Sequence, residues 1–177
     1  MKKIILGVTS SISAYKACDL TRLFIKAGYS VFPVLTENAA KMVTPLTFEN
    51  LSGNPVYTCS FQDERRDMAH IELKEGASLL LTAPATANII GKFAHGIADD
   101  LLSTTFLSVS CPVVIAPAMN PNMWNHPALK HNIEILKSWG VTIVEPEKGE
   151  ALCGDEGIGR LADIQKIYEV SLSVLEK

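Results

Sequence analysis

The sequence lacks several features that would assign it to common functional classes. It has no long apolar run, so no segment is expected to span a membrane, and its first residues, MKKIILGVTSS, contain too few apolar residues for a signal peptide. It has no cluster of lysine and arginine, and its net charge is −3, so nucleic acid and anionic membranes are not expected partners. No repeat, low-complexity tract or linker interrupts the chain, and its 177 residues predict a single domain, 1–177.

The cysteines and histidines are few and widely spaced. Cys18, Cys59, Cys111 and Cys153 form no CxxC pair, and with only four histidines no zinc-ligand pattern is present. We therefore expect reduced thiols in a cytoplasmic protein, most of them as small core residues. Cys153 is an exception because it lies among glycines and charged residues.

Apolar runs typical of buried strands alternate with segments typical of helices. Strands are predicted at about residues 2–9, 30–35, 78–85, 112–118 and 141–146. Helices are predicted at about 13–27, 37–43, 98–109, 128–140 and 162–177, with another helical stretch after residue 85. Continuous apolar strands separated by helices predict an α/β protein whose parallel sheet is flanked by helices on both faces. Pro33, inside the second strand, indicates limited pairing there.

Small and polar residues follow four of the predicted strands, in TSSIS, TENAA, APATAN and PAMNPNMW. Parallel sheets bind ligands beyond the carboxyl ends of their strands, so these segments predict a site at that edge. Strand ends often turn through such residues without binding anything, but PAMNPNMW (117–124) also contains two methionines and a tryptophan, which a plain turn does not need.

The first of these turns suits a phosphate group. Gly7, Ser10 and Ser11 leave a strand and enter a helix, whose free N–H groups favour an anion. Thr36 and Asn38, after the second strand, could serve the same phosphate. No GxGxxG motif is present, which favours a mononucleotide over a dinucleotide. The alternative is simple capping of the helix by the serines.

The segment after the third strand suits a flat ring. Ala83 and Pro84 are small enough for a ring to lie against the backbone, and Thr86 and Asn88 offer hydrogen bonds to its heteroatoms. By itself this pattern indicates only a ligand-binding loop.

Four motifs, taken in order, resemble those of the flavin-dependent cysteine decarboxylases. They are GVTSSISAYK, TAPATANIIGKFAHGIADDLL, PAMNPNMW and ALCGDEGIGRL, and the similarity covers nearly the whole chain. The resemblance implies a Rossmann-like three-layer flavoprotein fold and FMN bound between the subunits of a homotrimer or dodecamer. Because the chain ends at Lys177, it looks like the stand-alone form of this domain. Many relatives have two glycines where this chain has Ser10 and Ser11.

The resemblance also implies a reaction and its residues. The reaction is FMN-dependent decarboxylation of a small phosphorylated cysteine conjugate, 4'-phosphopantothenoylcysteine, in coenzyme A biosynthesis. Oxidation of the thiol to a thioaldehyde lets CO₂ leave, and the resulting ene-thiolate is protonated and reduced again. By motif position, His70 is the base beside the thiol, Asn120 holds the carboxylate with Met123 beside it, and Cys153 in a glycine-rich lid is the acid. Arg160 is one of several possible contacts for the substrate phosphate.

Four other functions remain open on the sequence alone. A flavin prenyltransferase of the same fold would need neither a lid cysteine nor this asparagine motif. A peptidyl-cysteine decarboxylase would act on a peptide, which the lid sequence disfavours. A non-catalytic flavin-binding regulator could have lost His70 or Cys153, and a flavodoxin-like electron carrier would not need a lid cysteine.

Overall fold

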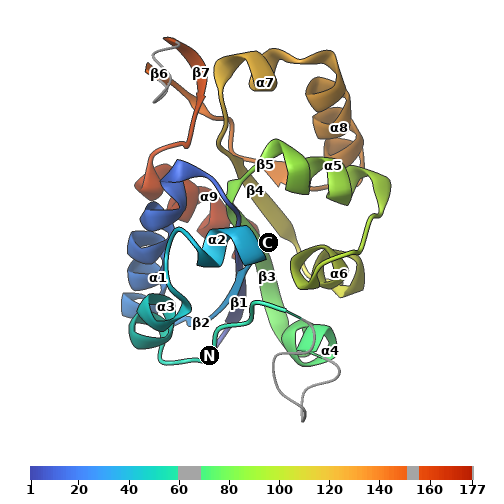
Figure 1. The fold of residues 1–177 in the computed structure, drawn as a ribbon. Helices are drawn as coiled ribbons and strands as arrows, with labels where there is room; N and C mark the ends of the chain where they lie inside the picture. Colours follow the sequence, from blue (N-terminus) through green and yellow to red (C-terminus); the bar gives the residue numbers. More distant parts are fainter. Residues whose placement is uncertain (60–68, 151–155, 177) are drawn as a thin grey trace.

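The computed structural model describes residues 1–59, 69–150 and 156–176. A parallel sheet forms its centre (Figure 1), with strands in the order β2–β1–β3–β4–β5. These strands are β1 (Lys3–Val8), β2 (Ser30–Leu35), β3 (Ala77–Ala85), β4 (Val113–Pro117) and β5 (Thr142–Ile143). The predicted parallel α/β sheet is therefore confirmed.

Alternation along the strands divides the core into two layers of apolar contacts, one on each face of the sheet. Ile4 and Leu6 of β1 face one cluster, and Ile5 between them faces the other; all three are fully buried. The first face is covered by α1 (Lys16–Lys26), α2 (Glu37–Ala40), α3 (Pro45–Ser52) and α9 (Ile164–Leu175). The second is covered by α4 (Ala69–Lys74), α5 (Ala87–His95), α6 (Leu101–Ser108), α7 (Pro121–Asn125) and α8 (Pro127–Ser138). This is the three-layer arrangement that the resemblance implied.

Local sequence signals mark the helix ends. Gly28 and Gly140 follow α1 and α8 with φ of 84° and 86°, a left-handed conformation that favours glycine. Pro127 is the first residue of α8, where its missing N–H costs no hydrogen bond. Asp100 caps α6 in a reciprocal pair with Ser103.

Several segments differ from the prediction. Residues 45–52 form α3, which the weak spacing of their apolar residues did not indicate. Near residue 57 the chain forms only a single bridge, from Tyr57 to Val34, on the outer side of β2. This leaves β2 near the sheet edge, which suits Pro33.

The carboxyl-terminal part of the sheet also differs. β5 contains only two residues, although six were expected, and Pro146 soon after it cannot donate a ladder hydrogen bond. Beyond it, β6 (Glu147–Glu150) and β7 (Glu156–Arg160) pair as an antiparallel ribbon outside the main sheet. Figure 1 shows this ribbon beyond the carboxyl edge, near α7. Within the described part of the chain, no helix has the length and apolar character needed to cross a membrane.

Candidate functional site

The strand order determines where a ligand site can form. Chain connections run in opposite directions from β1 and β3, so a crevice opens between their carboxyl ends. The turn after β1 continues into a short 3-10 helix, η1 (Ile12–Tyr15), and the turn after β3 enters α5. The predicted serines and the predicted threonine–asparagine pair therefore meet at this crevice.

Thr9 ties these two turns together. Its hydroxyl donates to the carbonyl oxygen of Pro84 (2.8 Å) and accepts the backbone N–H of Thr86 (3.0 Å). The side chain is buried, at 1% exposure, so these bonds lie away from competing water. One strand further along, the N–H of Ala118 donates to the carbonyl of Ala85 (3.0 Å). The ends of β1, β3 and β4 thus form one hydrogen-bonded floor.

A polar cavity of about 250 Å³ lies over one part of this floor. It is lined by Thr9, Ser10, Thr36, Glu37, Asn38, Thr86, Asn88, Ile89, Lys92, Asp99 and Asp100. Thr36 and Thr86 each accept a backbone N–H at the start of a helix, from Ala39 and Ile89 respectively. A hydroxyl that accepts one bond still has its own hydrogen to donate, so capping and ligand binding are compatible.

A compact ion cluster closes one side of the polar cavity. Lys92 Nζ lies 2.6 Å from Asp99 Oδ1 and 2.6 Å from Asp100 Oδ2. Burial alone would lower the pKa of Lys92, but the hydrogen bonds and charges of Asp100 and Asp99 together raise it above its ordinary value. Burial would raise the pKa of Asp100, yet the bonds from Lys92 and Ser103 hold that pKa below its ordinary value. Lys92 therefore stays charged and is already neutralised by the two carboxylates.

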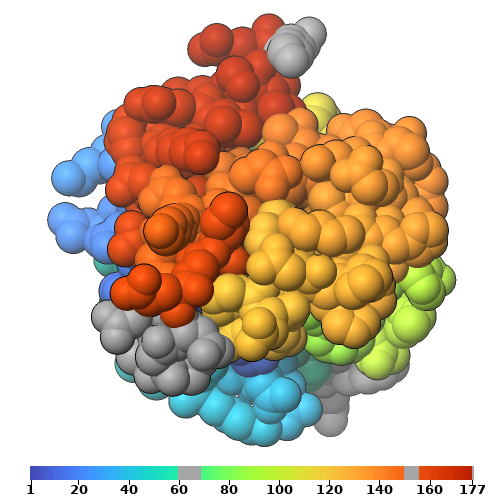
Figure 2. All heavy atoms as spheres, turned by 90° about the horizontal axis from the view of Figure 1, so that it is seen from above, coloured from blue at the N-terminus to red at the C-terminus, as the bar shows by residue number. Residues whose placement is uncertain are grey.

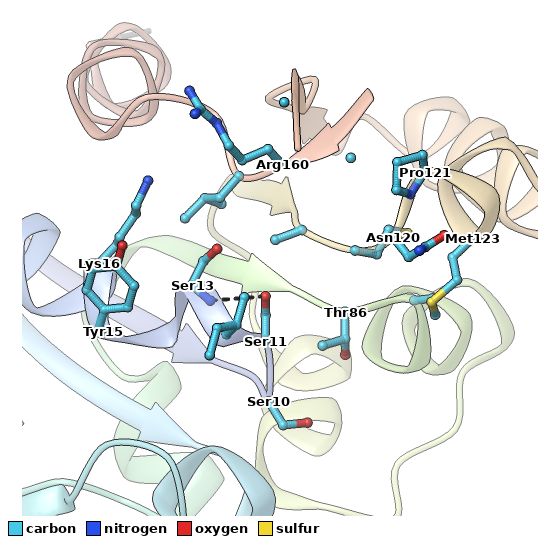
Figure 3. Close-up of a pocket in the computed structure, with 17 residues that line it drawn as sticks. Ser10, Ser11, Ser13, Tyr15, Lys16, Thr86, Asn120, Pro121, Met123 and Arg160 are labelled. Carbon is cyan, nitrogen blue, oxygen red and sulfur yellow. Dashed lines mark hydrogen bonds between the residues drawn. The ribbon is translucent and has the colours of Figure 1, made fainter. Parts of the chain in front are cut away.

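A larger, less polar cavity of about 690 Å³ lies beside the polar one, and we call it the edge cavity. Ser10 and Thr86 line both cavities, so the two adjoin. The edge cavity is further lined by Ser11, Ile12, Ser13, Tyr15, Lys16, Ala87, Ala118, Met119, Asn120, Pro121, Met123, Gly149, Gly159, Arg160 and Leu161. Figure 3 shows these residues converging from η1, the β4–α7 loop and the β6–β7 ribbon. Its volume is in the range of small-molecule sites.

Asn120 is held in a defined orientation at the end of β4. Its Oδ1 accepts the backbone N–H of Asn122 (2.7 Å), so the side chain caps α7. Because that bond uses the oxygen, the amide nitrogen lies on the other side of the group, and Asn120 is one of the residues that line the edge cavity. The residue can present N–H donors to an anionic ligand group.

Glycines let the β6–β7 ribbon pack against this loop. The N–H of Met119 donates to the carbonyl of Gly159 (2.9 Å). A Cβ at Gly159 would clash with the carbonyl oxygen of Met119, and one at Gly157 would lie 2.7 Å from Pro121 Cβ. The ribbon can therefore cover the Asn120 loop only because these two positions carry no side chain. Figure 2 shows the ribbon beside the segment that contains α7 at this end of the molecule.

The remaining residues of the PAMNPNMW motif have separate roles. Trp124 is 3% exposed and packs in the core on the second face, with Lys130 Nζ 3.9 Å from the centre of its ring. Met123 is 48% exposed and lines the edge cavity. It also lines a shallower cavity of about 460 Å³ between α5, α7 and α8. The tryptophan is a core anchor, and the methionine faces the site.

Three of the predicted ligand residues support the site without lining either cavity. A Cβ at Gly7 would lie 2.6 Å from Leu102 Cδ1, so this glycine allows α6 to pack closely on β1. Ala83 and Pro84 are buried at the end of β3, where the carbonyl of Pro84 bonds to Thr9. By contrast, Ser10, Ser11, Thr36, Asn38, Thr86, Asn88, Asn120 and Met123 all line one of the cavities.

His70, another predicted catalytic residue, does not line either cavity of this chain. His70 is half-buried near the start of α4. Lys3, at the amino end of β1, donates to the carbonyls of Glu72 in α4 and of Glu75 just after it. Figure 1 accordingly shows α4 at the opposite end of the sheet from α7. Cys153 lies outside the described residues.

Sequence reasoning overlooked several residues that build the site. Thr9, Lys16 and Lys92 are not among the site residues that the sequence predicts. A signal for Lys92 was available, because it lies seven and eight residues before two aspartates with a glycine turn between them. No local signal identifies Thr9, since its partners lie 75 and 77 residues away.

The fold and the site together define an α/β protein that binds a ligand at the carboxyl edge of a doubly wound sheet. The polar cavity, with its hydroxyl and amide groups, suits a phosphate-bearing chain, and the adjoining edge cavity, with Ala118 and Met119, suits a flat ring. A family model described as Flavoprotein matches residues 1–176, and the chain belongs to this family.

Curated relatives and solved structures agree with that membership. The chain is 44% identical over 171 residues to the coenzyme A biosynthesis bifunctional protein CoaBC of Bacillus subtilis (strain 168). The match covers 96% of this chain but 42% of that protein, so the chain spans about two fifths of its relative. A CoaBC of Mycolicibacterium smegmatis is 42% identical, with 99% of this chain and 42% of the relative covered.

Among solved structures, a cysteine-to-serine mutant of PPC decarboxylase complexed with pantothenoylaminoethenethiol has a TM-score of 0.88 and 28% identity, with 99% of both chains covered. The FMN-dependent cysteine decarboxylase SpaF has a TM-score of 0.84 and 32% identity, with 100% of this chain and 98% of that one covered. The predicted fold and the predicted family are both confirmed.

Proposed function

We propose that this chain decarboxylates 4'-phosphopantothenoylcysteine to 4'-phosphopantetheine, with FMN as cofactor, as a step of coenzyme A biosynthesis. The observation that carries the proposal is Asn120, held by its cap on α7 at the wall of the edge cavity. Two similar proteins support the substrate: a coenzyme A biosynthesis protein among the relatives, and PPC decarboxylase among the structural neighbours, with 99% of both chains covered.

The residues of the two adjoining cavities fit FMN. The hydroxyls of Ser10, Thr36 and Thr86 and the amides of Asn38 and Asn88 would hold its phosphate and polar chain. The cation of Lys92 is already paired with two aspartates, so it serves to fix α5 against α6 and not to bind phosphate. When bound, FMN supplies an acceptor for two electrons from the thiol end of the substrate and returns them after CO₂ has left.

Asn120 would bind the carboxylate that departs as CO₂. Its amide N–H groups can donate to the carboxylate, and the fixed cap removes most of the entropy cost of holding it in place. Ala118, Met119 and Met123 beside it form an apolar wall that excludes water from the reacting end. In this role Asn120 aligns the carboxylate so that the bond to be broken is the one next to the oxidised carbon.

We further propose that the active form is a homotrimer or a dodecamer, because His70 would then act on the edge cavity of a neighbouring copy. His70 lies at the far end of its own sheet, so it can serve as the base beside the thiol only in another subunit's site. Cys153 is proposed as the acid that protonates the ene-thiolate. The free thiols of Cys18, Cys59 and Cys111 suit a reducing cytoplasm.

The test is to incubate the purified, FMN-loaded protein with 4'-phosphopantothenoylcysteine and to measure CO₂ and 4'-phosphopantetheine. Release of both in equal amounts supports the proposal. Parallel reactions with a peptide that ends in cysteine, and with a prenyl phosphate, test two other reactions known for this fold. Turnover of either of those substrates in place of the first, or FMN binding with no turnover at all, would overturn it.

A further inference from the structure

Two cations line the edge cavity away from Asn120. Lys16 is the first residue of α1, and Arg160 is the last residue of β7. Both belong to the lining of the edge cavity, and Figure 3 shows them on the side of the pocket opposite Asn120 and Met123.

The topology explains why the cations and the amide are separated. Lys16 follows β1 and Asn120 follows β4, and β3 lies between these two strands. Neighbouring strands are about 4.8 Å apart, so the two loops start about 10 Å from each other along the sheet edge. The edge cavity is therefore elongated, with N–H donors from Asn120 at one end and two cations toward the other.

Contacts within the chain leave these cations available to a ligand. Arg160 is 54% exposed, and one of its nitrogens lies 3.5 Å from Glu147 Oε2. The other oxygen of Glu147 accepts the backbone N–H of Asp163, which fixes the carboxylate and so orients the arginine. An arginine has five N–H donors, and this contact uses one. Lys16 is half-buried and makes no ion pair with any residue in 1–59, 69–150 or 156–176.

The side chain of Arg160 lies across β6 at Gly149. A Cβ at Gly149 would lie 2.9 Å from Arg160 Cδ and 3.3 Å from its Nε, so the stem of Arg160 crosses β6 where there is no side chain. Gly149 lines the same cavity. The missing side chain at Gly149 therefore leaves room for the side chain of Arg160 at the wall of the edge cavity.

We propose that Arg160 and Lys16 form the site for the phosphate end of the substrate, an inference that rests on the proposed function. In 4'-phosphopantothenoylcysteine the carboxylate and the phosphate are at opposite ends of an extended molecule. The carboxylate at Asn120 and the phosphate at Arg160 and Lys16 match the two ends of the elongated cavity. A guanidinium group binds phosphate through two parallel N–H donors, and the lysine adds a second positive charge. This pair selects a phosphorylated conjugate over a peptide that ends in cysteine.

The same chemistry could instead serve the phosphate of FMN, and flavin retention distinguishes the two. The experiment compares 4'-phosphopantothenoylcysteine with pantothenoylcysteine, which lacks the phosphate, in the wild type and in Arg160→Gln, Lys16→Gln and the double variant. Lys148→Gln is the matched control, because it removes a neighbouring exposed cation of the ribbon that does not line the cavity. Flavin content is measured for every variant.

The inference predicts that each variant of the pair loses about 10- to 100-fold in kcat/KM for the phosphorylated substrate, mostly through KM. The dephosphorylated substrate should be affected less than about twofold, and so should every reaction of Lys148→Gln. Equal losses with both substrates would mean a structural role and would overturn the inference. Loss of FMN from the variants would assign the cations to the cofactor and would overturn it as well.

Binding measured without turnover separates this inference from the proposed function. Calorimetry compares 4'-phosphopantetheine with pantetheine on the FMN-loaded protein. Tighter binding of the phosphorylated compound, lost in Arg160→Gln, supports the phosphate site even if the wild type fails to release CO₂, in which case only the proposed reaction is wrong. If the wild type binds both compounds equally, the phosphate site does not exist, whatever the activity.

Discussion

The hydroxyl of Thr9 accepts the backbone N–H of Thr86 at 3.0 Å while it donates to the carbonyl of Pro84 at 2.8 Å. This one side chain joins the turn after β1 to the turn after β3, across the crevice where the two strands diverge. Ser10 follows Thr9, and both Ser10 and Thr86 line the two cavities. The distance between the two turns, and with it the shape of the site, therefore depends on Thr9.

Thr9→Val should weaken both the fold and cofactor binding. Valine has nearly the same shape, but it leaves the buried carbonyl of Pro84 without its donor and the part-buried N–H of Thr86 without its acceptor, which costs about 1–3 kcal/mol. Chemical denaturation at fixed protein concentration measures the free energy of unfolding, and titration of the apoprotein with FMN measures affinity. Thr9→Ser keeps the hydroxyl and should retain the affinity. A Thr9→Val protein with wild-type affinity would show that the turns are positioned by other contacts.

The Lys92–Asp99–Asp100 cluster predicts a dependence of stability on acid. The pKa of Asp100 is lowered in the folded protein, so its stabilising contribution is complete above the unfolded pKa of about 3.9 and is lost as pH falls through the folded pKa. Asp100→Asn removes the charge but keeps an oxygen that can cap α6. It should lower the free energy of unfolding by about 1 kcal/mol at pH 7, and the difference should shrink below about pH 4.

Asp100→Ala is the matched comparison for this effect. It also removes the acceptor for the N–H of Ser103, so about 0.5–2 kcal/mol of capping energy should be missing at every pH. Urea unfolding of the three proteins between pH 3 and pH 7 gives both differences. A deficit of Asp100→Asn that is constant over this range would mean that the charge of Asp100 contributes nothing.

The layers of the fold could be predicted because their signals are local. The apolar run of β1, the glycines after α1 and α8, and Asp100 before α6 each specify their own element. The β6–β7 ribbon and the shortness of β5 were not predicted, because strand pairing depends on distant partners. The ribbon itself is fixed by the contact of Gly159 with Met119, which no spacing in the sequence reveals.

Candidate site residues could be predicted only where they lie just after the end of a strand. Ser10, Thr86 and Asn120 each lie within three residues of the end of a strand, and parallel strands bring such residues to one edge. Gly7 was predicted to approach a phosphate, whereas its close neighbour is Leu102 of α6, which packs on β1 from the second face. Lys16 and Arg160 come from elements 144 residues apart, so their presence in one cavity follows from the fold alone.

Replacing a glycine of the ribbon with alanine should lower the stability of the protein, whereas replacing a glycine inside a helix should raise it. Gly159→Ala forces β7 away from the Asn120 loop, and overpacking of this kind costs about 1–3 kcal/mol. Gly91→Ala, inside α5, places its Cβ 3.6 Å from Asn132 Nδ2, an ordinary contact, and should stabilise the helix by about 0.5–1 kcal/mol. Thermal unfolding of both variants checks the signs. Unchanged stability in Gly159→Ala would mean that the ribbon does not pack on the loop in solution.

Asn120→Asp should abolish most activity without disturbing the loop. Aspartate is as good a helix cap as asparagine, so its oxygen can still accept the N–H of Asn122. It lacks the amide donors and carries a negative charge that repels the substrate carboxylate, so kcat/KM should fall by about 10- to 100-fold or more. Asn122→Asp makes the same chemical change on an exposed residue outside the edge cavity and should stay within about twofold of the wild type. Equal losses in the two variants would point to charge in general, not to Asn120.

Mixing two inactive variants tests whether a site is shared between copies. Under the proposed function, His70→Asn and Asn120→Asp should each be nearly inactive as pure oligomers, because every site would lack either the proposed base or the proposed carboxylate ligand. In a mixed oligomer, a site formed by Asn120 of one copy and His70 of the next is intact when each comes from the correct variant. With random mixing this holds for about a quarter of the sites, so about a quarter of wild-type activity should return.

The mixture is prepared by unfolding and refolding the two variants together, with each pure variant refolded as its control. Light scattering gives the oligomeric state, and flavin absorbance shows that FMN is retained. If both residues served the site of the same chain, the mixture would stay inactive, since no chain in it carries both. Because α4 lies at the far end of the sheet from Asn120, we expect activity to return in the mixture. A mixture that stays inactive would contradict the shared site.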